Sequence, residues 1–117
     1  MYPLVENTRV AKGQHLAEFE IYVMAALVRL GEEAYGMTVR QEIEARSGRA
    51  VAIGAVYATL ERLSGKGYVR FHVSDPRPVQ GGRARKHACL TAAGRRAFDE
   101  AASMMLRMLP GTARGSR

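Results

Sequence analysis

The chain has 117 residues, enough for one domain with its own hydrophobic core but too few for two. Hydrophobic residues make up 47% of it and charged residues 25%, as is usual for a folded soluble protein. The formal net charge of +7 favours a polyanionic partner, and nucleic acid first among these. The single cysteine, Cys89, excludes an internal disulfide, and no apolar run resembles a signal peptide or reaches the length of a membrane span. We therefore expect a cytoplasmic protein with no membrane partner.

Residues 1–14 show no periodicity and are predicted to form a flexible N-terminal arm. From residue 15 to residue 30, apolar side chains recur at three- and four-residue steps, which predicts a helix with one buried stripe. The stripe consists of Leu16, Phe19, Val23, Leu27 and Leu30. Tyr22, Met24 and Ala26 widen the apolar surface beside the stripe. This width is typical of a helix with two neighbours, one of which can come from another subunit.

Two shorter helices are predicted next, over residues 36–47 and 53–66. Val39 and Ile43 form the inward pair of the first, and a glycine closes each helix. The buried side of the second consists of Val56, Leu60 and Leu63. Its exposed side then holds Ala55, Tyr57, Ala58, Thr59, Glu61 and Arg62.

The periodicity changes from helical to alternating after these helices, which predicts a β-hairpin. Residues 68–73 and 85–90 form its strands, and the long tip between them contains two prolines, which cannot donate to a ladder. Thr91 is a suitable N-cap for a last helix that runs to about Leu109. Residues 110–117 are predicted to be a disordered basic tail.

The predicted fold class is mainly α with a β-hairpin wing: a winged helix-turn-helix over residues 15–90, followed by a C-terminal dimerisation helix over residues 91–109. In such a fold the second helix of the helix-turn-helix enters the DNA major groove, and a basic wing contacts the flanking backbone. The residues expected to bind DNA are Ile53, Gly54, Ala55, Tyr57, Ala58, Thr59, Arg62 and Lys66 in the helix, and Arg77, Gly82, Arg83, Arg85 and Lys86 in the wing. The simpler alternative is a solvated basic loop with no anionic partner.

The last predicted helix carries an apolar seam at three- and four-residue steps, which is typical of a helix that pairs with a second copy. The alternative is an ordinary amphipathic helix that folds onto its own subunit. The predicted dimer interface consists of Leu16, Phe19, Tyr22, Phe98, Ala101, Met104, Met105 and Met108. Because methionine-rich seams are adaptable, a small apolar or aromatic effector at this interface is a further hypothesis.

Metal and catalytic sites are not predicted. His72 and His87 can face each other across the hairpin with Cys89 nearby, but they do not supply the four donors of a zinc site. No nucleophile, base and orienting group converge, so we expect neither cofactor nor enzymatic activity. The Tyr35 ring is expected to cover the start of the second helix.

Several segments resemble the short PadR-type transcriptional regulators. They are FEIYVMAALVRLGEEAYGMTVRQEIE, GRAVAIGAVYATLERLSGKGYV, GGRARKH and LTAAG, and the similarity extends over about residues 16–109. The resemblance implies a homodimeric winged-helix protein, commonly a repressor, whose last helix dimerises and whose third helix and wing contact operator DNA. Two departures stand out. Ala52 replaces the family's usual Ser before the third helix, and His87, Ala88 and Cys89 replace aromatics in the returning strand.

Two other classes of function remain as alternatives. The first is a winged-helix module that binds another protein, with the positive charge incidental. The second is a basic protein at a membrane surface, which is disfavoured because the apolar helices carry core stripes and no basic amphipathic face.

Overall fold

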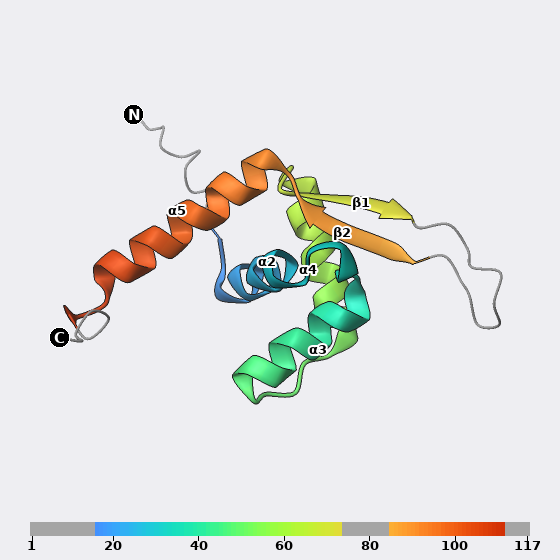
Figure 1. Ribbon diagram of the computed structural model, residues 1–117, viewed down its shortest axis with the longest axis horizontal. Coiled ribbons are helices and arrows are strands. Elements are labelled where there is room, and N and C mark those ends of the chain that lie inside the picture. Colours follow the sequence, from blue (N-terminus) through green and yellow to red (C-terminus); the bar gives the residue numbers. More distant parts are fainter. Residues whose placement is uncertain (1–15, 74–84, 112–117) are drawn as a thin grey trace.

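The computed structural model describes residues 16–73 and 85–111. Its elements are, in order, α2 (Glu18–Leu30), the 3-10 helix η1 (Gly31–Glu33), α3 (Gly36–Ser47), α4 (Ile53–Gly65), β1 (Val69–Val73), β2 (Lys86–Leu90) and α5 (Ala92–Met108). Helices α2, α3 and α4 form a cluster from which the hairpin projects to one side and α5 to the other (Figure 1). This arrangement confirms the predicted fold class, a winged helix-turn-helix followed by a long C-terminal helix.

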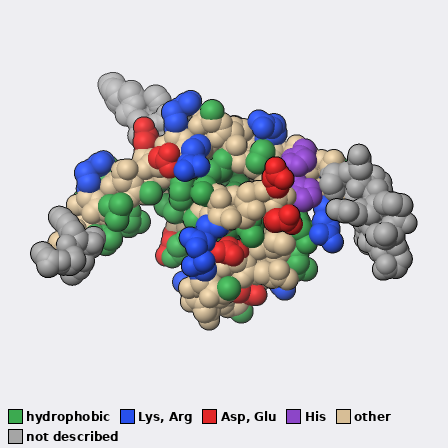
Figure 2. All heavy atoms as spheres, in the orientation of Figure 1, with side chains coloured by type: hydrophobic (Ala, Val, Ile, Leu, Met, Phe, Trp, Pro, Cys, Tyr) green, Lys and Arg blue, Asp and Glu red, His purple; other side chains and the backbone are tan. Residues whose placement is uncertain are grey.

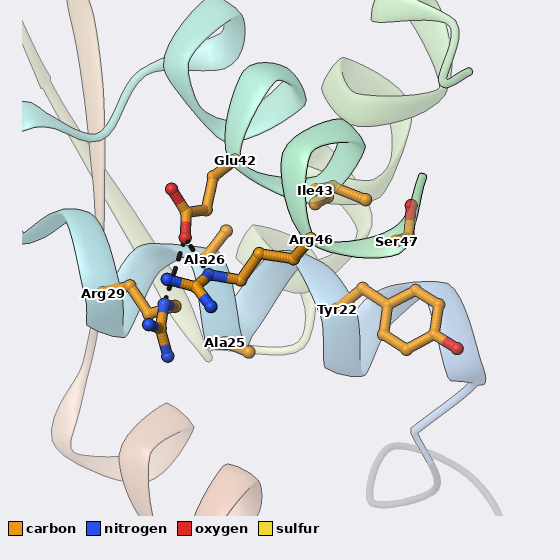
Figure 3. A pocket seen from close by; sticks show the side chains of 8 residues that line it. All are labelled: Tyr22, Ala25, Ala26, Arg29, Glu42, Ile43, Arg46 and Ser47. Atoms are coloured by element: carbon orange, nitrogen blue, oxygen red, sulfur yellow. Dashed lines mark hydrogen bonds and ion pairs between the residues drawn. The ribbon is translucent and has the colours of Figure 1, made fainter. Parts of the chain in front are cut away.

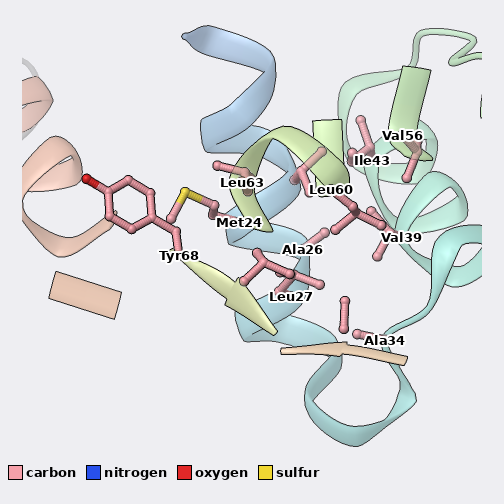
Figure 4. Close-up of a cluster of buried hydrophobic side chains, with 13 residues drawn as sticks. Met24, Ala26, Leu27, Ala34, Val39, Ile43, Val56, Leu60, Leu63 and Tyr68 are labelled. Atoms are coloured by element: carbon pink, nitrogen blue, oxygen red, sulfur yellow. The ribbon is translucent and has the colours of Figure 1, made fainter. Parts of the chain in front are cut away.

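Side chains from the first three helices meet in one hydrophobic core (Figure 4). The buried members on the helices are Val23, Met24, Ala26, Leu27, Val39, Ile43, Val56, Leu60 and Leu63. Ala34, Val69 and Ala88 extend the core beneath the hairpin. Burying a Val or Leu side chain stabilises the fold by about 1.5–3 kcal/mol, so this core holds α4 firmly against α2 and α3.

Helix α2 differs from its prediction at its start and in its buried face. It begins at Glu18 and not at residue 15, because the backbone N–H of Ala17 donates to the Glu20 carboxylate at 2.9 Å and caps the helix there. Met24 and Ala26, expected beside the buried stripe, are 0% and 2% exposed, whereas Leu16, Phe19 and Leu30 are only partly buried. The reason is that α2 contacts α3, α4, β2 and α5, so more than one of its faces is covered.

The turn from α4 into β1 has the geometry of a Schellman motif. Gly67 adopts a φ of 82°, a conformation that a residue with a side chain rarely takes. The N–H of Tyr68 donates to the carbonyl of Leu63 at 2.9 Å, and the N–H of Gly67 donates to that of Ser64 at 2.9 Å. The hairpin therefore starts at a fixed angle to α4.

The junction between the hairpin and α5 is equally well defined. Thr91 is the N-cap, as predicted: its hydroxyl accepts from the N–H of Gly94 at 3.0 Å and donates to the carbonyl of Gly67 at 2.7 Å. A Cβ at Gly94 would overlap the backbone of Tyr68, so only glycine lets α5 approach β1 this closely. Helix α5 thus leaves the hairpin in one orientation.

Candidate nucleic-acid interface

Helix α4 turns one face to the core and one to solvent. Val56, Leu60 and Leu63 point inward, as their spacing predicted. Of the residues predicted to bind DNA, Gly54, Ala55, Tyr57, Ala58 and Arg62 are exposed, and Ile53 is half-buried. No side chain caps the helix at Ala52. The exposed face therefore consists mostly of small residues, which allow a flat partner to approach the backbone closely.

Thr59 is a correction to the predicted interface. It is 1% exposed, because it lies between Val56 and Leu63 on the inward face of α4. Its hydroxyl accepts from Nη2 of Arg62 at 3.0 Å. Thr59 therefore orients Arg62 from within the protein and cannot itself reach a partner.

A buried carboxylate, Glu20 at the start of α2, gathers the cations at the end of α4. Nζ of Lys66 donates to both of its oxygens at 3.0 Å, and Nε of Arg62 lies 3.5 Å from Oε2. Burial acts to raise the pKa of Glu20, but the hydrogen bonds from Ala17 and Lys66 and the two nearby positive charges outweigh it. The pKa therefore lies below the ordinary value of 4.5. Lys66, predicted to bind DNA, is mainly a partner of Glu20, whereas the Arg62 side chain stays 56% exposed.

Tyr57 connects α4 to the helix before it. A Cβ at Gly36 would overlap the Tyr57 ring, so this ring lies directly on the first residue of α3. Tyr57 is nevertheless 48% exposed. The contact fixes the ring in place and leaves part of it available to a partner.

The wing strands pair antiparallel, with His72 opposite His87. The two imidazoles stack with centroids 5.2 Å apart, and Figure 2 shows these histidines together beside the hairpin. Ala88 donates its N–H to the carbonyl of Ala34 at 3.0 Å, which attaches β2 to the loop before α3. The returning strand is therefore anchored to the core although His87, Ala88 and Cys89 stand where the resemblance implied aromatic residues.

Tyr35 anchors one of the predicted DNA-binding cations of the wing. Its ring meets His87 edge-on at 5.6 Å, and its hydroxyl accepts from Nη1 of Arg85 at 2.8 Å. The Arg85 guanidinium also lies 4.6 Å from the centre of the Tyr35 ring. Tyr35 is thus a positioning residue for Arg85, beyond the packing role predicted for it. No sequence pattern indicates this contact, because Tyr35 and Arg85 are 50 residues apart in the chain.

Lys86, the next residue, bridges the wing and α4. Its ammonium lies 3.3 Å from the Glu61 carboxylate and 4.3 Å from the centre of the Phe71 ring. Glu61 was predicted to be exposed but was not counted among the DNA-binding residues. The remaining predicted wing contacts, Arg77, Gly82 and Arg83, lie outside the described residues.

The predicted dimer interface divides into two parts. Leu16, Phe19 and Tyr22 on or beside α2 are half-buried, as are Phe98 and Ala101 on the first half of α5. Beyond them α5 extends away from the core, and its hydrophobic side chains gather at its far end (Figure 2). The exposed ones are Met104, Met105, Leu106, Met108 and Leu109.

A pocket of about 380 Å³ lies between α2 and α3 (Figure 3). It is lined by Tyr22, Ala25, Ala26, Arg29, Glu42, Ile43, Arg46 and Ser47. At one end, Nε of Arg46 and Nε of Arg29 reach Oε2 of Glu42 at 2.6 and 3.0 Å. The hydrogen bond from Arg46, joined by Arg29, lowers the pKa of the Glu42 carboxyl. The pocket thus combines an apolar floor with a charged rim.

Within residues 16–73 and 85–111, no three His, Cys, Asp or Glu side chains are grouped so that they could hold a metal ion. In the same part of the chain, no helix is long and apolar enough to span a bilayer.

Both the sequence and the fold of this chain are similar to those of known transcriptional regulators. The sequence matches the profile of the transcriptional regulator PadR-like family over residues 23–100. Similar solved structures include RosR of H. salinarum, at 26% identity and a TM-score of 0.61, covering 82% of this chain and 79% of that one. A PadR-like transcription factor from Bacteroides fragilis is 20% identical with a TM-score of 0.65, covering 88% and 92% of the two chains.

A PadR family transcription regulator from Clostridium difficile is 21% identical with a TM-score of 0.59, and the match covers 75% of this chain and 86% of that one. A search among curated proteins finds no significant match.

Proposed function

Because the chain belongs to the PadR-like family of transcriptional regulators, it is a DNA-binding regulator and not an enzyme, and we propose that it acts as a homodimeric repressor at specific operator sites. Residues 15–90 would form the DNA-binding domain and residues 91–109 the dimerisation helix. The observation that carries the proposal is the exposed small-residue face of α4 beside a basic wing.

The chemistry of this surface supports binding in the major groove. The groove is about 12 Å wide and admits one helix, and Gly54, Ala55 and Ala58 let the backbone of α4 come close to base edges. Arg62 at one side and Arg85 at the base of the wing carry exposed positive charge for phosphates. The wing residues Arg77, Gly82 and Arg83 remain proposed contacts of the same kind.

The exposed apolar end of α5 supports the homodimer. Met105 is 52% and Met108 73% exposed, and neither side chain packs against the hydrophobic core. A second copy would remove this surface from water, at about 25 cal/mol for each Å² of apolar area.

The pocket between α2 and α3 supports a response to a small apolar or aromatic effector. Its volume is within the range of small-molecule sites, and Tyr22, which lines it, also belongs to the proposed dimer interface. An effector bound there would contact the dimer interface and α3 at once.

The proposal is tested by enriching sheared genomic DNA on the full chain and then titrating the recovered duplex. We expect it to bind at least about 10³-fold more tightly than a scrambled duplex, with affinity falling steeply as salt rises. Adding the protein to transcription from the same duplex should reduce the transcript. If no duplex is enriched and binding is insensitive to salt, the chain is better described as a protein-interaction module.

A further inference from the structure

One line of residues on α4 points most directly away from the core. Gly54, Ala58, Glu61 and Gly65 recur at four-, three- and four-residue steps, opposite the buried face, and all four are exposed. We call this line the outward stripe. Glu61 is the one member with a side chain longer than a methyl group, and 63% of that side chain is exposed. A partner that approaches α4 head-on therefore meets a carboxylate flanked by small residues.

The longer side chains beside the outward stripe are already engaged within the protein. The Tyr57 ring lies on Gly36. On the opposite flank of the helix, the Arg62 side chain contacts the Thr59 hydroxyl and the Glu20 carboxylate. These contacts draw both side chains toward the flanks of the helix, so the centre of the face is left to Glu61.

A carboxylate at a DNA-facing surface repels phosphates, and the wing supplies the compensating charge. Nζ of Lys86 lies 3.3 Å from Oε2 of Glu61, and the same ammonium lies over the Phe71 ring. The pair reduces the repulsion without hiding the carboxylate, since the two side chains stay 53% and 63% exposed. Glu61 thus keeps free acceptor capacity at the centre of the face.

We propose that Glu61 is a specificity-determining residue of α4 and selects cytosine in the major groove; this rests on the proposed placement of α4 in that groove. A carboxylate only accepts hydrogen bonds. Cytosine presents the N4 amino donor, whereas guanine presents two acceptors, thymine an acceptor and a methyl group, and adenine an acceptor beside its donor. Among the four bases, cytosine is the one whose major-groove edge presents a donor with no acceptor on the same base.

The test exchanges the carboxylate for an amide of the same shape. The full chain and its Glu61→Gln variant are each used to select binders from a library of randomised DNA duplexes. We expect the wild type to require cytosine at one position of the motif, and Glu61→Gln to prefer adenine there, because an amide pairs with N6 and N7 of adenine. On the wild-type motif, the ratio of specific to scrambled affinity should fall about 5- to 150-fold for this variant.

Two controls separate base reading from charge and from folding. Glu100→Gln removes another exposed carboxylate, on α5, and should keep the wild-type motif. Glu61→Ala should lose the cytosine preference without gaining adenine, and thermal melts of all variants should match the wild type.

The outcomes that overturn the proposal differ from those that overturn the function on which it rests. Identical motifs for wild type and Glu61→Gln would refute the role of Glu61 and leave specific DNA binding intact. If the cytosine preference is instead lost in Lys86→Gln and kept in Glu61→Gln, the wing and not Glu61 reads that base. If the wild type enriches no motif, both the operator-binding function and the role of Glu61 are wrong.

Discussion

The face of α4 and the far end of α5 both expose long stretches of surface, but with opposite chemistry. On α4, the exposed residues apart from Tyr57 are small or charged, and the charges of Arg62 and Glu61 are paired with Glu20 and Lys86. At the end of α5, Met105 and Met108 expose apolar surface with no partner element beside them within the described residues. The charges of the first surface are thus paired within one copy of the chain, whereas the apolar side chains of the second are the ones that the proposed dimer would cover.

The largest effect is expected from a charge placed on the apolar end of α5. Met105→Asp should turn the dimer into a monomer, because an unpaired carboxylate would have to be buried in the interface. We expect a loss of about 3 kcal/mol or more in association free energy, the scale of an interface hot spot. Sedimentation at micromolar concentration measures it. Ser103→Asp, at another exposed position of α5, should have little effect. A wild-type monomer would contradict the proposed dimer.

The next largest effect should come from the ion cluster beneath α4. Glu20→Gln leaves Lys66 and Arg62 without their carboxylate, and we expect the free energy of unfolding to fall by about 2 kcal/mol. This loss is smaller than for a fully buried ion pair, because the side chains of Lys66 and Arg62 reach solvent. Urea unfolding at pH 7 measures it. Glu100→Gln is the control that changes charge without touching the cluster.

The same carboxylate should give the fold a dependence on acid. Because the pKa of Glu20 is lowered in the folded state, its contribution is complete above the ordinary value of 4.5 and is lost as the pH falls through the lower, folded-state value. The unfolding free energy of the wild type should therefore decline more steeply below pH 4.5 than that of Glu20→Gln. Parallel decline of the two proteins would show that other groups govern acid unfolding.

Arg62 contacts Glu20 and Thr59 and also exposes its charge on the proposed DNA-binding face of α4. Arg62→Ala should therefore affect both the stability of the fold and the affinity for DNA. Arg62 was predicted to lie on the exposed side of the helix, where a substitution usually costs under about 0.5 kcal/mol of stability. Its contacts with Glu20 and Thr59 now predict a loss of about 1 kcal/mol in stability. DNA binding should weaken by about 1.5 kcal/mol, the scale of one charged hydrogen bond. Thermal melts and duplex titrations on the same samples separate the two, with Arg96→Ala on α5 as the control.

The smallest effect is expected at the wing. Arg85→Ala removes one exposed cation that Tyr35 positions, so it should weaken binding to operator and scrambled duplex alike by less than about 1 kcal/mol. The slope of log K against log salt should shrink by roughly 0.9, as for one lost phosphate contact. A loss confined to the operator would show that the wing reads bases.

Most of the fold could be predicted because local signals and tertiary contacts agree. The inward residues of α4 follow from the spacing of Val56 and Leu60, and the alternation of the strands places His72 opposite His87. Thr59 was misplaced because its polar side chain suggested exposure, although its position matches the buried face.

The roles of the charged residues could not be predicted in the same way. Lys66 and Glu20 are 46 residues apart in the chain, and no periodic pattern reports such a contact. Glu61 was predicted to be exposed but was not included among the DNA-binding residues. Its pairing with Lys86 depends on how the hairpin folds back toward α4, which is a property of the tertiary structure.

The junction at Thr91 and Gly94 gives α5 the mechanical character of a lever. Since the helix is capped on the hairpin base and packed against the backbone of Tyr68, a rotation of α5 carries the wing and α4 with it. In a dimer built on α5, the crossing angle of the two levers would set the distance between the two α4 helices. That distance must match about one turn of DNA, 34–36 Å, or a multiple of it. The spacing of an operator's half-sites would then be encoded far from any base, in how two C-terminal helices cross.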